Sequence, residues 1–352
     1  MPKKRLLRIG GNLKRTPPDN RDFGLVDIFL QPDLSEIPNE WSFWKPLEIK
    51  DQKGTQECTG HGVAAAIEAH EGVIINPSAQ YAFIKDIADD PTDSGANLRD
   101  AMKSGLDYGA VEKKDCDLGV DNHNGSFLAD LANYPPEIIE KAKPHKQLSY
   151  FNATRGRYNR FDNFRTWLWY FRNDKPVIVT GVGWRENWTY AEDGIIPEDQ
   201  GDITGGHCVV ILPEQRIING EPYLKIQNSY NTDVGDKGCF WVNQKVVKRD
   251  FTFGGYIYRD LEPEKIKQII NQKTMAEEPS VKYQFNTEEG NKVFKSLLLS
   301  LGGFVLVKLI ELLGQYDFGN FTSLIAALSP FLINSVRLWL QGQGADVLAK
   351  KK

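Results

Sequence analysis

Four residues in three widely separated segments have the types and spacing that nucleophilic catalysis requires. Cys58 supplies a thiol, His207 an imidazole and Asn228 a side-chain amide, and Gln52 adds a second amide six residues before the thiol. A thiol with a base, a group that orients the base and a donor to an oxyanion are the components of acyl transfer by a cysteine nucleophile. These four residues form the candidate catalytic set.

The elements around Cys58 must make its thiol reactive, because a free thiol has a pKa of about 8.5 and is mostly protonated at neutral pH. The small residues of 58–72 predict a buried helix that begins at or just before Cys58. A helix N-terminus and a neighbouring imidazolium both lower the pKa of a thiol. We therefore expect His207 to accept the thiol proton and Asn228 to orient the imidazole. Gln52 and the backbone N–H of Cys58 are expected to donate to the oxyanion.

The remaining Cys and His residues have simpler interpretations. His61 follows Cys58 by three residues, but on such a helix it points along the axis rather than across a cleft, so it is not expected to be the base. Cys208 and Cys239 lie in strand-forming runs and are expected to be buried. The Cys and His spacing does not suggest a zinc site, and we expect no metal and no cofactor.

The sequence changes from helix-forming to strand-forming segments after about residue 145. Further helices are predicted at 77–88 and 96–108, and strands at 176–180, 208–212, 223–227 and 238–242. A helical half followed by an antiparallel half predicts an α+β fold, with the cleft between the halves as the natural site. The loop at 89–95 and the face near 184–188 are expected to line that cleft.

The segments 51–58, 205–210 and 228–238 resemble the active-site segments of the papain-like cysteine peptidases. The third is similar to that family's Asn-Ser-Trp-Gly-x-x-Trp-Gly-x-x-Gly stretch. The resemblance covers roughly residues 15–260 and implies a two-lobed fold of a helical lobe and an antiparallel β lobe. It also implies hydrolysis of peptide bonds through a thioester acyl-enzyme, with the roles given above for Cys58, His207, Asn228 and Gln52.

The spacing of these residues agrees with the resemblance in part. His207 lies 149 residues after Cys58, within the family's interval of about 130–150 residues. Asn228 lies 170 residues after Cys58, which is longer. A loop insertion near 183–203 or 213–222 would explain the difference.

Several positions depart from the family pattern. Thr59 replaces the aromatic residue that usually follows the nucleophile, and Thr55 replaces a half-cystine. Tyr230 replaces the Trp after Asn-Ser and could still shield the His–Asn hydrogen bond from water. Only about 45 residues precede Asp51, so no long inhibitory propeptide is expected. These features resemble the disulfide-free bacterial and phage-type members.

Composition limits the partners and the compartment. The chain has 352 residues, 41% hydrophobic and 26% charged, with a net charge of −4, so it should be globular and nucleic acid is not an expected partner. Four cysteines do not make a disulfide framework, and the N-terminus lacks a secretory signal. We expect a reducing compartment, either the cytoplasm or a virion, with peptide or protein as substrate.

The chain beyond the peptidase-like segments contains two apolar stretches. The expected organisation is an N-terminal arm (1–45) over the surface, a papain-like domain (46–260), a polar linker (261–293), an apolar helical hairpin (294–341) and a basic tail (342–352). The hairpin has basic outer flanks, which fits a membrane anchor with both ends in the cytoplasm. The alternative is an amphipathic hairpin that packs on the protein or in an oligomer, which its polar residues favour.

Three functions are compatible with the sequence. The first is a cysteine peptidase with the four residues above at its site. The second is a catalytically silent structural or binding protein on a papain-like scaffold, motivated by the substitutions at Thr55, Thr59 and Tyr230. The third keeps the acyl-transfer chemistry but directs it to peptidoglycan cross-links or isopeptide bonds, which active-site residues alone do not distinguish.

Overall fold

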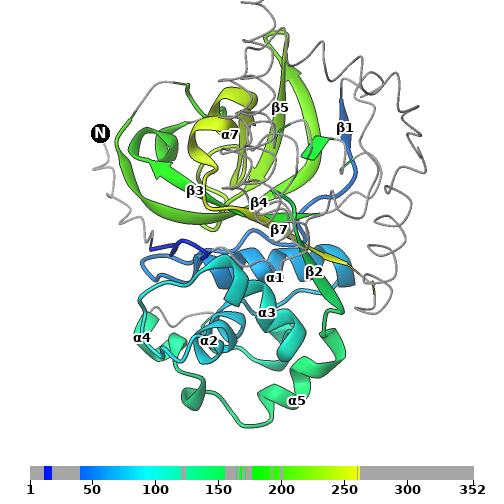
Figure 1. The fold of residues 1–352 in the computed structure, drawn as a ribbon, viewed down its shortest axis with the longest axis vertical. Helices are drawn as coiled ribbons and strands as arrows, with labels where there is room; N and C mark the ends of the chain where they lie inside the picture. Colours follow the sequence, from blue (N-terminus) through cyan, green and yellow to red (C-terminus); the bar gives the residue numbers. More distant parts are fainter. Residues whose placement is uncertain are drawn as a thin grey trace, which may run out of the picture. The chain divides into compact units, whose positions relative to one another are not determined.

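Helices precede an antiparallel sheet in the part of the chain that the structure describes (Figure 1). The computed structural model describes residues 12–17, 40–119, 124–154, 164, 167–168, 171, 177–191, 193–198, 201–259 and 261. All of these belong to the first of two units, residues 1–276. The predicted apolar hairpin and basic tail, and all of the linker after residue 261, lie outside the described residues.

The first half of the described chain forms a helical lobe. Its main helices are α1 (Cys58–Glu71), α2 (Pro77–Ile87), α3 (Leu98–Asp107), α4 (Gly125–Ala129) and α5 (Ile138–Ala142). Asparagine side chains cap three of them: Asn76 accepts hydrogen bonds from the first turn of α2, Asn97 from that of α3 and Asn124 from that of α4. Gly72, at φ +74°, ends α1 in the left-handed conformation that glycine adopts readily.

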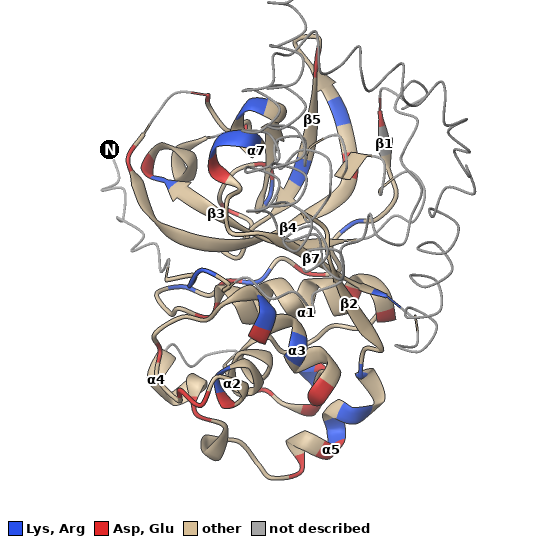
Figure 2. Ribbon diagram, in the orientation of Figure 1, with Lys and Arg blue, Asp and Glu red and all other residues tan. Residues whose placement is uncertain are grey.

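Small residues allow α1 to be buried on almost every side. A Cβ atom on Gly62 would lie 2.6 Å from the Cys208 sulphur, and one on Gly60 would lie 2.4 Å from the Pro77 carbonyl oxygen. Glycine is therefore needed at both positions for α1 to approach its neighbours this closely. Charged residues lie only towards the C-terminal ends of α1 and α2, whereas acidic and basic residues are distributed along α3 (Figure 2).

The second half forms a β lobe. Its sheet has the order β2-β7-β3-β4-β5-β6, with β1 also paired to β4, and every pair is antiparallel. The strands are β1 (Trp41–Ser42), β2 (Ser149–Asn152), β3 (Ile178–Arg185), β4 (Ile203–Ile218), β5 (Glu221–Gln227), β6 (Cys239–Asn243) and β7 (Gly255–Arg259), and helix α7 (Gln244–Asp250) lies between the last two.

Alternation along β4 sends successive side chains to two different cores. Val209 and Ile211 belong to the hydrophobic cluster that contains Trp184. Cys208 and Val210 belong to a second cluster, which contains the buried face of α1. Side chains on a strand point to opposite faces in turn, so a continuous apolar run such as this one is covered on both sides.

The predictions for these elements are largely confirmed. The three predicted helices agree with α1, α2 and α3 to within two residues at each end. The predicted strands are confirmed, although β3 continues to Arg185 and β4 runs for 16 residues. The segment 213–222, a candidate insertion, forms the outer part of the β4–β5 hairpin. Among the described residues, the helices are too short or too polar to cross a membrane.

Candidate active site

Cys58 is the first residue of α1, and its side chain is fully buried. Burial raises the pKa of its thiol to about 11, and hydrogen bonds from the backbone of Cys208, Thr59 and Cys58 itself lower it in part. The thiol is therefore neutral at pH 7 in this structure. The predicted position of Cys58 at a helix start, where backbone N–H groups favour an anion, is confirmed.

His207 lies on β4 and is held by Asn228, the residue that follows β5. The distance from His207 Nε2 to Asn228 Oδ1 is 2.7 Å, and both side chains are buried. The backbone N–H of Ser229 also donates to Asn228 Oδ1, which identifies that atom as the acceptor. Nε2 of His207 therefore carries a proton, and Nδ1 is left as the atom that could accept one.

Burial also sets the charge of His207. It lowers the pKa of the imidazole to about 4, although the hydrogen bond to Asn228 acts in the opposite direction. His61, through its charge, lowers the pKa of His207 further. Both the imidazole of His207 and the thiol of Cys58 are therefore neutral at pH 7, because burial disfavours the charged form of each.

Two aromatic side chains enclose the His207–Asn228 hydrogen bond. The Tyr230 ring stacks on the imidazole with 4.9 Å between centroids and 18° between planes, and the Trp184 ring meets it edge-on at 5.2 Å. The Tyr230 hydroxyl lies 3.4 Å from His207 Nδ1. Tyr230 and Trp184 are almost completely buried, so the side chain at 184 is a wall of the histidine site rather than an open cleft surface.

Gln52 is joined to the same part of the chain through Ser229. The Ser229 hydroxyl donates to Gln52 Oε1 at 2.5 Å, and the Gln52 backbone N–H donates to the Ser229 carbonyl oxygen at 2.8 Å. Gln52 Nε2 donates to the Thr55 carbonyl oxygen at 2.8 Å. The amide of Gln52 therefore has a fixed orientation at the start of the turn that leads to Cys58. Reasoning from the sequence did not assign this role to Ser229, although the Asn-Ser pair of the motif is the signal that points to it.

The fold brings all four candidate residues to one region. The Cys58 thiol meets the backbone of Cys208, which directly follows His207. Cys58 is also close enough to the Tyr230 hydroxyl, which contacts His207, that a thiolate there would raise the pKa of that hydroxyl. Asp51, next to Gln52, pairs with Tyr230 in an isolated antiparallel bridge.

The other histidine and cysteine residues lie in different surroundings. His61 faces Glu57, the residue directly before α1, with 3.5 Å between His61 Nε2 and Glu57 Oε1. Cys208 and Cys239 are buried and Cys116 is half-buried, and none of the three is in a disulfide. The burial predicted for Cys208 and Cys239 is confirmed.

An N-terminal segment, residues 12–17, lies beside this site. The Leu13 N–H donates to the Gly206 carbonyl oxygen at 3.0 Å, directly before His207, and the Lys14 N–H donates to the Ala96 carbonyl oxygen at 2.9 Å. Leu13 is buried in the core that contains Cys58. Figure 1 shows the segment, in dark blue, between the helical lobe and the sheet. Leu13 is buried, whereas Asn12, Lys14, Arg15 and Pro17 are exposed, so this part of the arm lies along the surface between the lobes and inserts one side chain into the core.

Solved structures with the same fold are cysteine proteases and their precursors. The chain is similar to xylellain, a cysteine protease from Xylella fastidiosa, with a TM-score of 0.58 and 19% identity over 74% of this chain and 99% of xylellain. It is also similar to procathepsin L 3 of the Tenebrio molitor larval midgut (TM-score 0.51, 13% identity, 68% of this chain and 76% of that one). A third similar structure is procathepsin B S9 from Trypanosoma congolense (0.50, 14%, 70% and 87%).

These similarities show that the chain has a papain-like fold, as its sequence motifs predict. No protein-family model matches the sequence. At such low identity the solved structures show the fold, while activity must be argued from the residues of the site.

Proposed function

We propose that this chain is a cysteine peptidase with Cys58 as nucleophile and His207 as base. The observation that carries the proposal is the hydrogen bond between His207 Nε2 and Asn228 Oδ1, enclosed by Tyr230 and Trp184. This bond fixes the tautomer in which Nδ1 is ready to accept a proton. Cys58 stands at the start of α1, against the backbone of the residue that follows His207.

The proposed reaction uses only side chains and backbone groups of the chain. His207 takes the thiol proton, and the Cys58 sulphur attacks the carbonyl carbon of a peptide bond. The Gln52 side chain and the Cys58 N–H stabilise the oxyanion, the C–N bond breaks, and His207 gives its proton to the departing amine. Water then attacks the thioester, with His207 as base, and this step releases the acid and restores the thiol.

Three further side chains are proposed to position the reacting groups, because each contacts one of them. Asn228 holds the imidazole through its side-chain oxygen, and Ser229 holds the Gln52 amide. Tyr230 excludes water from the His207–Asn228 bond, which strengthens that bond because the surroundings have a low dielectric constant.

A thiol-directed epoxide tests the proposal on the full chain. With His207 as its base, Cys58 should be alkylated at least about tenfold faster than Cys116, a half-buried thiol whose pKa is raised by burial. Cys58→Ala should lose the label and peptide hydrolysis together, whereas Cys116→Ala, the matched control, should keep both. Peptide mapping by mass spectrometry identifies the modified residue.

Two results would contradict the proposal. One is a label that survives Cys58→Ala, because the reactive thiol would then lie elsewhere. The other is an unlabelled Cys58 together with no hydrolysis of any peptide, which would favour a silent papain-like scaffold. If the chain instead released cross-linked fragments from purified cell wall and left denatured protein intact, the substrate of the same chemistry would be peptidoglycan.

A further inference from the structure

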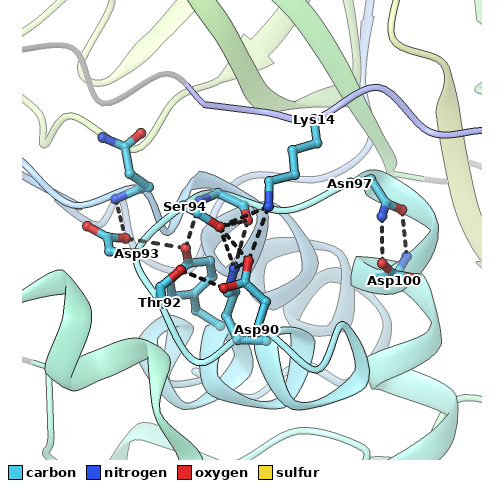
Figure 3. A network of polar contacts seen from close by, with 11 residues as sticks. Lys14, Asp90, Thr92, Asp93, Ser94, Asn97 and Asp100 are labelled. Carbon is cyan, nitrogen blue, oxygen red and sulfur yellow. Dashed lines mark hydrogen bonds and ion pairs between the residues drawn. The ribbon is translucent and has the colours of Figure 1, made fainter.

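The loop between α2 and α3 contains a polar network centred on Asp90 (Figure 3). Lys85, on α2, is fully buried, and its ammonium group donates to Asp90 Oδ2 at 2.6 Å and to Ser94 Oγ and the Gly95 carbonyl oxygen at 3.0 Å each. The hydroxyl groups of Thr92 and Ser94 donate to Asp90 as well. A buried cation therefore fixes the Asp90 carboxylate and the Ser94 hydroxyl in place.

Lys14 of the N-terminal segment binds this fixed pair. Its ammonium group lies 3.1 Å from Asp90 Oδ2 and 2.8 Å from Ser94 Oγ. Its backbone N–H is bonded to Ala96, and the preceding residue, Leu13, is bonded to Gly206 beside His207. The segment is thus held by its main chain at both lobes, as an extended peptide would be, while one basic side chain reaches an acidic group at the edge of the cleft.

The network is prepared for a cation in addition to Lys85. Asp90 accepts from both the Lys85 and the Lys14 ammonium groups, whereas the neighbouring Asp93 accepts from the Gln56 N–H and the Tyr81 hydroxyl. Burial alone would raise the pKa of Asp90, but the hydrogen bonds from Lys85, Ser94 and Thr92 outweigh it and hold that pKa well below its usual range. Asp90 therefore stays ionised at neutral pH.

The contacts of Lys85 do not depend on Lys14. Lys85 is held by the loop's own groups, whereas the Lys14 side chain is 48% exposed and reaches the loop from a separate segment. Because Lys85 and the loop's own hydroxyl groups hold Asp90 and Ser94, these two groups have partners other than Lys14, which is the feature expected of a preorganised binding site.

We propose that Asp90 and Ser94 form a subsite for a basic side chain of the peptide substrate, and that Lys14 fills this subsite in the structure. The role of the cleft as a substrate groove rests on the proposed function. The substrate class is then an extended peptide with Lys or Arg at the position whose main chain pairs with Ala96. The N-terminal segment competes with such a peptide for the same groups.

Paired peptides test the subsite on the full chain. In one series a single lysine is moved along an otherwise neutral peptide, and in the second series norleucine replaces that lysine. Norleucine keeps the apolar stem of lysine and removes the ammonium group. At one position, kcat/KM should be about tenfold higher with lysine, the size expected for a partly exposed ion pair with an additional hydrogen bond. At the other positions the two series should agree.

Two variants separate the subsite from a general effect of charge. Lys14→Ala removes the competitor and leaves Lys85 paired with Asp90, so it should lower KM for the preferred lysine peptide. Lys146→Ala, which removes an exposed lysine before β2, is the matched control and should leave KM unchanged. Asp90→Asn should abolish the preference for lysine, and circular dichroism checks that this variant folds despite the altered partner of Lys85.

The outcomes distinguish failure of the subsite from failure of the proposed function. Equal cleavage of the two series at every position, or equal KM values for Lys14→Ala and Lys146→Ala, would overturn the subsite while leaving the peptidase intact. If no peptide is cut, fluorescence anisotropy measures binding of both series to the wild type and to Cys58→Ala. Tighter binding with lysine at one position then supports the subsite without catalysis, and equal binding overturns it.

Discussion

Acidification should destabilise this fold through His207. Burial lowers the pKa of this imidazole from 6.5 to about 4. The unfolded chain therefore binds a proton below pH 6.5 that the folded chain does not bind until about pH 4, so stability falls as the pH falls through this interval. The difference of about 2.5 pKa units, at about 1.4 kcal/mol for each unit, corresponds to about 3 kcal/mol.

The measurement compares urea unfolding of the wild type and His207→Gln at several pH values between 7 and 4. Carboxyl groups titrate in both proteins, so the difference between the two free energies of unfolding isolates the histidine. That difference should shift by about 3 kcal/mol in favour of the variant as the pH falls. His70→Gln, which changes an exposed histidine at the end of α1, serves as the control. Parallel pH profiles for the wild type and His207→Gln would refute a neutral, water-excluded imidazole.

Two substitutions test how the site is held in place. Asn228→Ala leaves the buried N–H of His207 without its acceptor, so it should destabilise the fold by about 1–3 kcal/mol and slow alkylation of Cys58. An unchanged rate of Cys58 alkylation in this variant would show that Asn228 does not position His207 for the reaction. Gly62→Ala forces a Cβ atom against the Cys208 sulphur and should cost about 1–3 kcal/mol in urea unfolding. Cys208→Ala in the same chain should restore part of that loss, and strictly additive effects would show that the two atoms do not meet.

Local signals account for the parts of the fold that the sequence could predict. The run of small residues after Cys58 marks a buried helix, and the left-handed glycine at 72 ends it. The short continuous apolar run at 208–212 predicts a buried strand, and both faces of β4 are indeed covered. The order and spacing of Cys58, His207 and Asn228 also predict a papain-like fold. The similar solved structures confirm that fold.

Contacts between distant segments account for what the sequence could not predict. The length of β4 depends on its pairing with β3, β1 and β5, and the position of Trp184 against His207 depends on the register of β3. The N-terminal segment was expected on the surface, because its composition is that of an irregular arm. Most of residues 12–17 are exposed, but the burial of Leu13 depends on main-chain bonds to two carbonyl oxygens far along the chain, which no local pattern reveals.

The protonation of the Cys58 thiol and the position of the N-terminal segment are linked through the burial of the site. Cys58 and His207 are fully buried, and burial is the largest cause of both pKa shifts. Leu13 belongs to the core cluster that contains Cys58, so the N-terminal segment contributes to the buried core in which the thiol lies. Exchange of this segment for a substrate would change the surroundings that keep Cys58 protonated. Because any coupling between two equilibria is reciprocal, a change that weakens the binding of Lys14 to Asp90 should also favour the thiolate.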